Sequence, residues 1–240
     1  MSIYKDKLYK LPRLYINNDI SKDSEINLNS DQSHYLKNVI RRNIGDHIRI
    51  FNGKDGEWIS EIISLNKKSC SISLLDKIKE QSNVVGEFHL IFAPIKKNRM
   101  DFIIEKAVEL GVTHLHPVIT KNTENRKVNI SRIEKQILEA TEQCERIDIA
   151  RLLEIDDLYN VLNRFSDINI IAAVERSDGV DIKKIENSGD IAYLVGPEGG
   201  FVSEEVEWVN NKSNVIAVSL GENILRAETA IIYGVSILKI

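Results

Sequence analysis

The ten residues from Ile191 to Gly200 read IAYLVGPEGG, and they decide both the fold and the place of a candidate site. The run Ile191–Val195 is apolar or aromatic without polar alternation, which is typical of a strand buried on both faces of a parallel sheet. The two glycines after Glu198 let the backbone approach a ligand closely. A helix capped by Ser203 is expected next. Strand, glycine loop and helix in this order favour a ligand site at the carboxyl end of a parallel sheet.

The loop by itself leaves an alternative open. Neither GxxxxGK[ST] nor GxGxxG occurs in the chain, so the two common nucleotide-binding loops are excluded. A tight connection between a strand and a helix would use the same residue types. A second motif is needed to decide between these interpretations.

That second motif spans residues 219–230, SLGENILRAETA, and follows the short apolar run Val215–Val218. The two stretches together resemble the C-terminal motifs of the SPOUT superfamily of RNA methyltransferases. The RsmE family, which methylates ring nitrogen N3 of a uridine in 16S ribosomal RNA of the small ribosomal subunit, is the closest match. Its pattern is an apolar strand, then GPEGG, then LGxRILRxETA, and the chain carries both motifs in that order at Gly196–Gly200 and Leu220–Ala230.

The resemblance implies an α/β fold class with two domains. Residues 1–78 would form a small PUA-like β-barrel that binds RNA, and residues 79–240 a SPOUT methyltransferase domain with a parallel sheet. It also implies a trefoil knot, although knots are almost absent from proteins. The implied cofactor is S-adenosyl-L-methionine, and the implied assembly is a homodimer. The apolar faces of two predicted helices, Asp101–Leu110 and Ala227–Lys239, exceed the need of one small core and independently favour that dimer.

Composition and charge fit this assignment. The chain has 240 residues, of which 42% are hydrophobic and 28% charged, as in an ordinary globular protein. It has no apolar run long enough for a membrane span and a charged N-terminus unlike a secretory signal, so a cytoplasmic protein without membrane contact is expected. Its two cysteines, Cys70 and Cys144, lack metal spacing, so no metal is expected, and Cys144 lies in an apolar helical pattern that favours packing.

The charge is divided unevenly along the chain. The net charge is −4, yet residues 1–80 hold 14 Lys+Arg against 11 Asp+Glu. This basic excess is small enough to arise by chance. It also fits an RNA contact on the N-terminal domain.

The N-terminal domain is predicted to be rich in strands at His47–Phe51, Trp58–Leu65 and Cys70–Leu75, separated by turn residues. Short strands at this spacing favour a small barrel. One helix interrupts them, capped by Ser30 or Asp31 and ending near Gly45. Its expected apolar face comprises Tyr35, Leu36, Val39 and Ile40. Residues 34–58 resemble the PUA-like barrel that opens RsmE proteins.

Beyond a polar linker at Lys77–Asn83, strands alternate with helices, which predicts a mainly parallel sheet. Pro117 predicts an edge strand or a strand end. The expected strands are Phe88–Ala93, His114–Ile119 and Ile168–Val174, the expected helices include Ser131–Cys144, and Pro94–Arg99 is a basic loop.

The candidate site residues follow from the resemblance. The cofactor-binding candidates are Ala173, Leu194, Val195, Gly196, Pro197, Glu198, Gly199, Gly200, Leu220, Gly221, Ile224, Leu225, Arg226, Glu228 and Thr229. Arg226 is the catalytic candidate, because a fixed cation would stabilise charge developing on the uridine carbonyls; the alternative is an ion pair with Glu198 or Glu228. The RNA-binding candidates are Lys37, Arg41, Arg42, Lys96, Lys97 and Arg99, for which solvated surface charge is the alternative.

The resemblance also covers EKAVELGV at Glu105–Val112 and EQCER at Glu142–Arg146, with departures from the family pattern. Glu145 stands where the family has glycine, and Asn122 and Asn223 stand where it often has arginine. The lost positive charges concern substrate contacts more than cofactor binding. Two other functions stay open: a SPOUT methyltransferase acting on a ribose 2′-hydroxyl, and a non-catalytic RNA-binding protein on the same fold.

Overall fold

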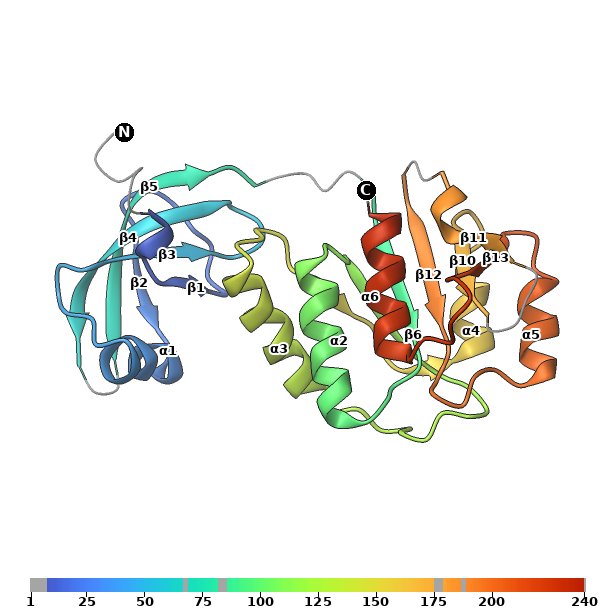
Figure 1. The fold of residues 1–240 in the computed structure, drawn as a ribbon. Helices are drawn as coiled ribbons and strands as arrows, with labels where there is room; N and C mark the ends of the chain where they lie inside the picture. The colour runs from blue at the N-terminus through green and yellow to red at the C-terminus, as the bar shows by residue number, and fades with distance from the viewer. Residues whose placement is uncertain (1–7, 67–68, 82–85, 175–178, 187–188, 240) are drawn as a thin grey trace. The chain divides into compact units, whose positions relative to one another are not determined.

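The computed structural model describes residues 8–66, 69–81, 86–174, 179–186 and 189–239. These residues form two compact units, coloured from blue to red along the chain in Figure 1. The first unit comprises residues 1–83 together with 141–148, and the second comprises residues 84–140 and 149–240. The predicted linker ends in residues 82 and 83, which lie outside the described ranges. No helix in the described ranges is long and apolar enough to cross a membrane.

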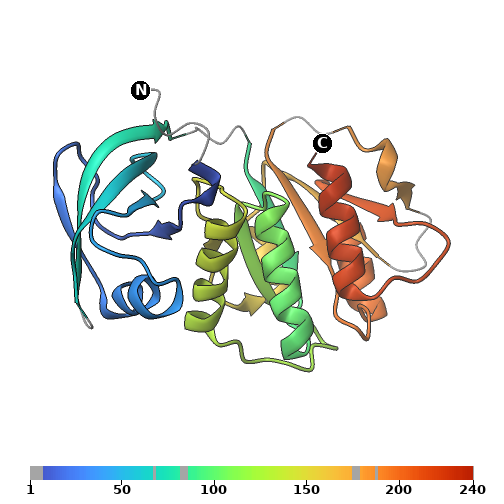
Figure 2. The same ribbon diagram turned by 60° about the vertical axis from the view of Figure 1, so that its left-hand side comes forward.

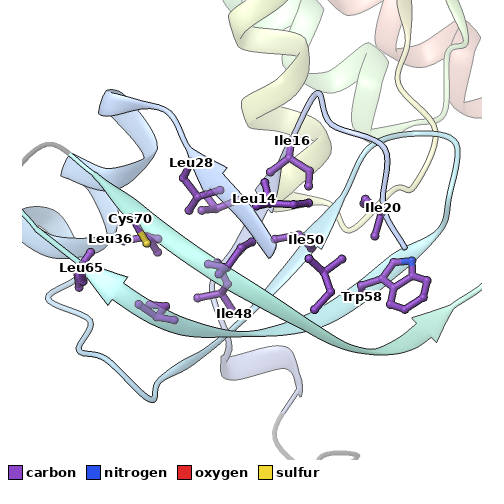
Figure 3. Packing of buried hydrophobic residues seen from close by; sticks show 14 residues of the cluster. Leu14, Ile16, Ile20, Leu28, Leu36, Ile48, Ile50, Trp58, Leu65 and Cys70 are labelled. Atoms are coloured by element: carbon purple, nitrogen blue, oxygen red, sulfur yellow. The ribbon is translucent and has the colours of Figure 1, made fainter. Parts of the chain in front are cut away.

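The first unit is built on one five-stranded sheet, in the order β1-β3-β4-β5-β2. Its strands are β1 (Arg13–Tyr15), β2 (Glu25–Leu28), β3 (His47–Phe51), β4 (Glu57–Leu65) and β5 (Cys70–Lys79). β1 pairs with β3 in parallel and the other pairs are antiparallel. The sheet curves around a core of apolar side chains, in which Figure 3 labels Leu14, Leu36, Ile48 and Ile50.

The helical segment of this unit differs from the prediction. A short 3₁₀ turn, η1 (Leu8–Lys10), precedes the sheet; α1 (Ser30–His34) passes into one π-helical turn, η2 (Tyr35–Val39), and ends well before Gly45. The cap is Asn29, whose side chain accepts from Gln32 N at 2.9 Å. The π-turn carries about 4.4 residues, so it rotates the expected apolar face. Only Leu36 and Ile40 pack on the core, whereas Tyr35 and Val39 are exposed.

A buried ionic network joins the EQCER segment to this sheet. Arg13 Nε lies 3.1 Å from Glu57 Oε1, and Arg13 Nη1 donates to Thr141 O at 2.8 Å. Arg49 Nη2 donates to Glu145 Oε1 at 2.6 Å. The backbone of Glu145 has a φ of 60°, the left-handed region that favours glycine. The family's glycine is therefore replaced by a strained residue whose carboxylate gains a buried arginine partner.

The second unit is an α/β fold with a parallel sheet, as predicted. Its strand order is β11-β13-β10-β12-β6-β7-β8, with β9 also pairing with β7, and every recorded pair is parallel. The strands are β6 (Phe88–Phe92), β7 (His114–Ile119), β8 (Arg151–Leu152), β9 (Asp156–Asp157), β10 (Asn169–Ala173), β11 (Val180–Asp181), β12 (Ile191–Val195) and β13 (Val215–Ser219).

Helices cover both faces of this sheet. They are α2 (Lys97–Glu109), α3 (Ile130–Gln143), α4 (Leu158–Asn163), α5 (Ser203–Asn210) and α6 (Ala227–Leu238), with a short 3₁₀ turn η3 (Ile182–Lys184). α2 and α6 lie side by side in both views (Figures 1 and 2). Successive side chains of a strand point to opposite faces of the sheet. In β12, Leu194 packs in the core with α4 and α5, whereas the Tyr193 hydroxyl on the other face donates to Ala230 O of α6 at 2.9 Å.

Three local predictions were wrong here. α2 begins at Lys97, so half of the expected basic loop is its first turn. Ser203 is the first residue of α5 and not its cap; instead the Glu205 side chain accepts from Val202 N at 3.1 Å. Pro117 lies in an interior strand: β7 pairs with β6 on one side, and its pairing with β8 and β9 on the other skips His116 and Pro117. This gap tolerates a residue without an N–H group.

Candidate functional site

The two sequence motifs meet at one cavity of the second unit. It lies where β10, β12 and β13 end at the carboxyl edge of the sheet, and its volume is about 1120 Å³. Open α/β sheets bind ligands in this position. The predicted residues that line the cavity are Ala173, Val195, Gly196, Pro197, Glu198, Gly199, Gly200, Leu220, Gly221, Ile224, Leu225 and Arg226.

Three predicted residues lie elsewhere. Leu194 is fully buried in the hydrophobic core beneath the loop. Thr229 is exposed on α6, and Glu228 is partly buried on the same helix without lining the cavity. In a β-strand neighbouring residues point to opposite faces, which is why Val195 reaches the cavity rim and Leu194 does not.

The GPEGG loop is held by its own neighbours. A Cβ on Gly196 would come within 2.8 Å of the Phe201 ring. Asn122 Nδ2 donates to both Gly199 O and Gly200 O at 3.1 Å. Asn122, one of the departures from the family pattern, thus clamps the loop from outside.

The Glu205 carboxylate is a second support, at the segment that follows the same loop. The Glu205 side chain is 1% exposed, and it accepts from Lys121 N at 2.8 Å and from Val202 N at 3.1 Å. Both donors are backbone groups that would otherwise lack a helix or sheet partner. One buried carboxylate therefore ties the segment after β7 to the start of α5.

The charged groups at the cavity are arranged around Arg99. Its Nη1 donates to Glu198 Oε1 at 2.5 Å, and its Nε lies 3.5 Å from Glu228 Oε1. Glu228 Oε2 is buried and has no hydrogen-bond partner in the described part of the chain. A buried carboxylate oxygen without a partner is a place where a ligand donor can bind.

Arg226 lies at the cavity with its side chain exposed. The two carboxylates considered as its partners both bind Arg99 instead. No ion pair links Arg226 to another residue in the described ranges, so its guanidinium can turn toward a ligand.

Sequence reasoning missed the place of Arg99, which was a candidate for RNA contact. It lies in the first turn of α2 and lines the cavity with Lys96. The missed signal was the helix start: once α2 is extended back to Lys97, Arg99 faces the glycine loop rather than lying in an open basic loop. Further lining residues outside the predictions are Val174, Phe201, Ser203, Val206, Val218, Ser219, Glu222, Asn223, Ala227 and Ala230.

The other basic candidates lie on two surfaces. Lys96 and Lys97 are exposed beside the cavity in the second unit. In the first unit, Arg41 is exposed with a φ of 56°, and Arg42 Nε is buried without a hydrogen-bond partner in the described residues. Lys37 Nζ donates to Leu65 O at 3.3 Å.

The cavity suits a cofactor with a nucleoside and an amino-acid end. Backbone groups of two glycine loops face it, and apolar side chains such as Val195, Leu220 and Ile224 offer surface for a flat ring. Ile224 is 65% exposed, so its side chain is open to a ligand.

Comparison with known proteins identifies the family of the chain. A family model described as an RNA methyltransferase domain matches residues 80–239, and one described as an RNA methyltransferase PUA domain matches residues 28–75. The ribosomal RNA small subunit methyltransferase E of Rickettsia conorii is 36% identical over 231 residues, covering 95% of this chain and 94% of its own. The protein of that name from Bacillus subtilis is 27% identical over 233 residues, with 90% of each chain covered.

The fold is shared with a solved structure of the same kind. A ribosomal RNA small subunit methyltransferase E from Neisseria gonorrhoeae, bound to S-adenosyl methionine, aligns with a TM-score of 0.84 at 27% identity. The alignment covers 94% of this chain and 96% of that chain. With both domains matched, and a relative above one-third identity over nearly its whole length, the chain belongs to the ribosomal RNA small subunit methyltransferase E family.

Proposed function

We propose that this protein transfers a methyl group from S-adenosyl-L-methionine to ring nitrogen N3 of a uridine in 16S ribosomal RNA. The observation that carries the proposal is the cavity where the GPEGG and LGENILR loops meet, in a chain of this family. The Neisseria gonorrhoeae relative holds S-adenosyl methionine. The cavity of this chain has the volume and the lining for the same cofactor.

The reaction depends on positioning the cofactor and the acceptor rather than on a covalent intermediate with the enzyme. The cofactor supplies an activated methyl group. The chain's residues must bind it, align it with the acceptor nitrogen and exclude water. The glycine loops provide close backbone contact, and Arg99 pairs with Glu198 in the cavity lining.

The second requirement concerns the charge that develops on the acceptor uridine. N3 of uridine carries a weakly acidic proton, and its loss leaves negative charge on the neighbouring carbonyl oxygens. Arg226 is a cation at the cavity, without an ion pair in the described residues, that can stabilise this charge as it develops. The group that accepts the proton is not assigned to a residue.

Nucleoside analysis tests the whole proposal. Purified chain, labelled cofactor and small ribosomal subunits lacking this methylation should yield 3-methyluridine. A labelled 2′-O-methyl nucleoside, or no transfer at all, would contradict it and would favour the two alternatives named from the sequence.

Gly199→Val is expected to weaken cofactor binding at least about tenfold, or about 1.4 kcal/mol, while the protein stays folded. The Cβ would lie 3.3 Å from Asn122 Cβ, and its branches would push against the side chain that clamps Gly199 O and Gly200 O. The effect thus arises from a displaced loop rather than from a methyl group inside the cavity. Calorimetric titration with S-adenosylmethionine measures the affinity.

Asn122→Ala is the matched control, because it removes the clamp without adding volume. It is expected to retain most of the affinity. The site assignment fails if Gly199→Val binds the cofactor normally, and the displacement mechanism fails if Asn122→Ala loses as much as the valine variant.

We further propose that RNA contact is divided between the two domains. Arg99 is held by two carboxylates, so in the second unit the phosphate contacts fall to Lys96 and Lys97. In the first unit Arg41 and Arg42 provide them, in a segment whose apolar side chains Tyr35, Val39 and Ile44 are also exposed. A basic surface with an exposed aromatic ring suits single-stranded RNA, which stacks bases on such rings.

Arg41→Ala combined with Arg42→Ala is expected to weaken RNA binding and to flatten its salt dependence by roughly one to two units, at about 0.7 to 0.9 per lost phosphate contact. Cofactor affinity should be unchanged, because both residues lie in the first unit. Filter binding across a series of salt concentrations gives the slope. The control is Lys22→Ala with Lys77→Ala, which removes equal charge from lysines that already pair with Asp76 and Glu80. A double variant with the parent slope would exclude this surface.

Three further properties are proposed from family resemblance. The chain is a homodimer, works in the cytoplasm, and carries a trefoil knot formed by the two glycine loops and α6. The prediction that the apolar face of α6 exceeds the need of the core was wrong in part. Ile231, Val235 and Leu238 of this helix are buried in the core of the unit. Phe102, 44% exposed on α2, and the half-buried Ile232 and Tyr233 on α6 remain for a dimer contact. Light scattering that gives a monomer mass at micromolar concentration would refute the dimer.

A further inference from the structure

Three of the five histidines of the chain gather at one place that the proposed reaction does not use. His89 lies on β6, and His114 and His116 lie on the adjacent β7. His89 and His114 are register partners, and their rings stack with centroids 4.5 Å apart. Glu87, immediately before β6, places its carboxylate beside them.

The ligand atoms of three of these residues converge. Glu87 Oε2 lies 3.2 Å from His89 Nε2 and 3.8 Å from His114 Nδ1. One ligand atom from each residue lies within 4.8 Å of the other two. Ligands of a tetrahedral ion with bonds near 2.05 Å are about 3.3 Å apart. The exposed Glu87 side chain can make the small adjustment that remains.

A buried nitrogen at the centre has no hydrogen bond. His89 is 7% exposed, and its Nε2 has no partner of good geometry in the described residues, despite its closeness to Glu87. Its other nitrogen, Nδ1, lies 3.0 Å from His116 Nε2. If Nδ1 carries the proton and donates to His116, Nε2 keeps its lone pair and has no protein partner among the described residues. This is the arrangement of a metal-binding histidine fixed through its second nitrogen.

The surrounding charges suit a cation. Asp190 adds a second carboxylate, which accepts from Glu87 N at 2.6 Å. Of the two nearby arginines, Arg164 pairs with Asp156, which leaves Arg151 as the opposing charge.

We propose that Glu87, His89 and His114 bind a divalent transition-metal ion of the zinc type, with His116 holding the ring of His89. Two imidazoles and one carboxylate form a ligand set that such ions prefer, and solvent can fill a fourth position. The ligands lie at the amino ends of β6 and β7, whereas the cavity lies at the carboxyl edge of the sheet. The ion therefore stabilises the sheet rather than taking part in methyl transfer. This departs from the sequence-based expectation of no metal.

The test uses the full, untagged chain stripped with a chelator and titrated calorimetrically with Zn²⁺, then with Co²⁺, whose visible absorption reports the coordination number. One ion per chain is expected to bind saturably and to raise the melting temperature. Glu87→Gln and His114→Asn each remove a ligand and should lower the affinity at least about tenfold. His116→Asn removes an outer partner and should lower it roughly 10- to 100-fold.

His34→Asn is the matched control, because this exposed histidine lies in the first unit. It should bind Zn²⁺ as the parent does. Melting of each variant in the presence of chelator establishes that it is folded, since Glu87 and His114 are not fully buried. Absence of saturable Zn²⁺ and Co²⁺ binding would overturn the proposal. Binding that survives unchanged in both Glu87→Gln and His114→Asn would also overturn it, because the ion would then lie elsewhere.

Discussion

Gly234→Ala is expected to lower the melting temperature of the second unit by roughly 4 to 8 °C, although alanine is the better helix former. An added Cβ would lie 2.2 Å from Tyr193 Cζ and 2.3 Å from its hydroxyl oxygen. Tyr193 is completely buried and donates to Ala230 O, so it cannot turn aside. A contact this close takes the upper end of the about 1–3 kcal/mol that overpacking a core costs. After subtracting about 1 kcal/mol gained in helix propensity, the net loss is about 2 kcal/mol, and each kcal/mol shifts the melting temperature by about 2–4 °C.

A displacement of α6 by this substitution should also affect the cavity. This helix begins directly after Arg226, and Glu228 lies in its first turn. A helix pushed away from Tyr193 moves both residues, so cofactor affinity should fall together with stability. Scanning calorimetry, with and without S-adenosylmethionine, measures both effects.

Ser236→Ala tests the specificity of this effect, because Ser236 lies on the same helix with its hydroxyl bonded to Ile232 O. It should change the melting temperature little. Tyr193→Leu removes the ring, so combining it with Gly234→Ala should cost less than the sum of the two single changes. An alanine variant more stable than the parent would show that α6 and β12 do not pack as described.

The strands β6, β7, β10, β12 and β13 of the second unit were predictable because each is a short, mainly apolar run next to a turn signal, whereas the two-residue strands β8, β9 and β11 were not predicted. Ile191–Val195 is buried at every position, so its sequence has no polar residue to confuse the assignment. Phe88–Phe92 is also buried at every position, although it includes His89. The contacts of the EQCER segment could not be predicted from the sequence. Glu145 has the character of a surface residue, and only the structure pairs it with Arg49, which lies on a strand almost a hundred residues earlier.

Local geometry limited the rest. The π-turn at Tyr35–Val39 changes which side chains face the core, and a helical pattern with 3.6 residues per turn cannot anticipate it. The predicted starts of helices were wrong where the capping group came from a residue other than the expected one. Asn29 was passed over for its neighbours Ser30 and Asp31, and α5 takes its capping oxygen from Glu205 inside the helix.

The candidate site shows the same division. The backbone of the glycine loops was predicted from motif and spacing alone. The ionic partners were not, because Arg99, Glu198 and Glu228 come from three separate segments and only the folded chain brings them together. That contact removes both proposed partners of Arg226, and it thereby strengthens the case for Arg226 as the group that meets the substrate.

Arg226→Ala is accordingly expected to lower kcat roughly 100-fold or more while RNA affinity and cofactor affinity stay near those of the parent. A preorganised donor that stabilises developing charge contributes about 10²–10³ in rate. Its contact matters little before the charge forms, so the loss should fall on kcat and leave KM unchanged. Single-turnover methyl transfer under saturating RNA and cofactor isolates this step from binding.

Two comparisons separate charge stabilisation from a general electrostatic effect. Arg226→Lys keeps the charge without the planar fork and should recover part of the rate. Lys184→Ala removes one exposed positive charge from the same unit, away from the cavity lining, and should leave the rate unchanged. If Arg226→Ala stays within about twofold of the parent kcat, or if Lys184→Ala loses as much, Arg226 does not stabilise the transition state. The stabilising cation would then have to be sought in Arg99, released from Glu198 and Glu228 when substrate binds.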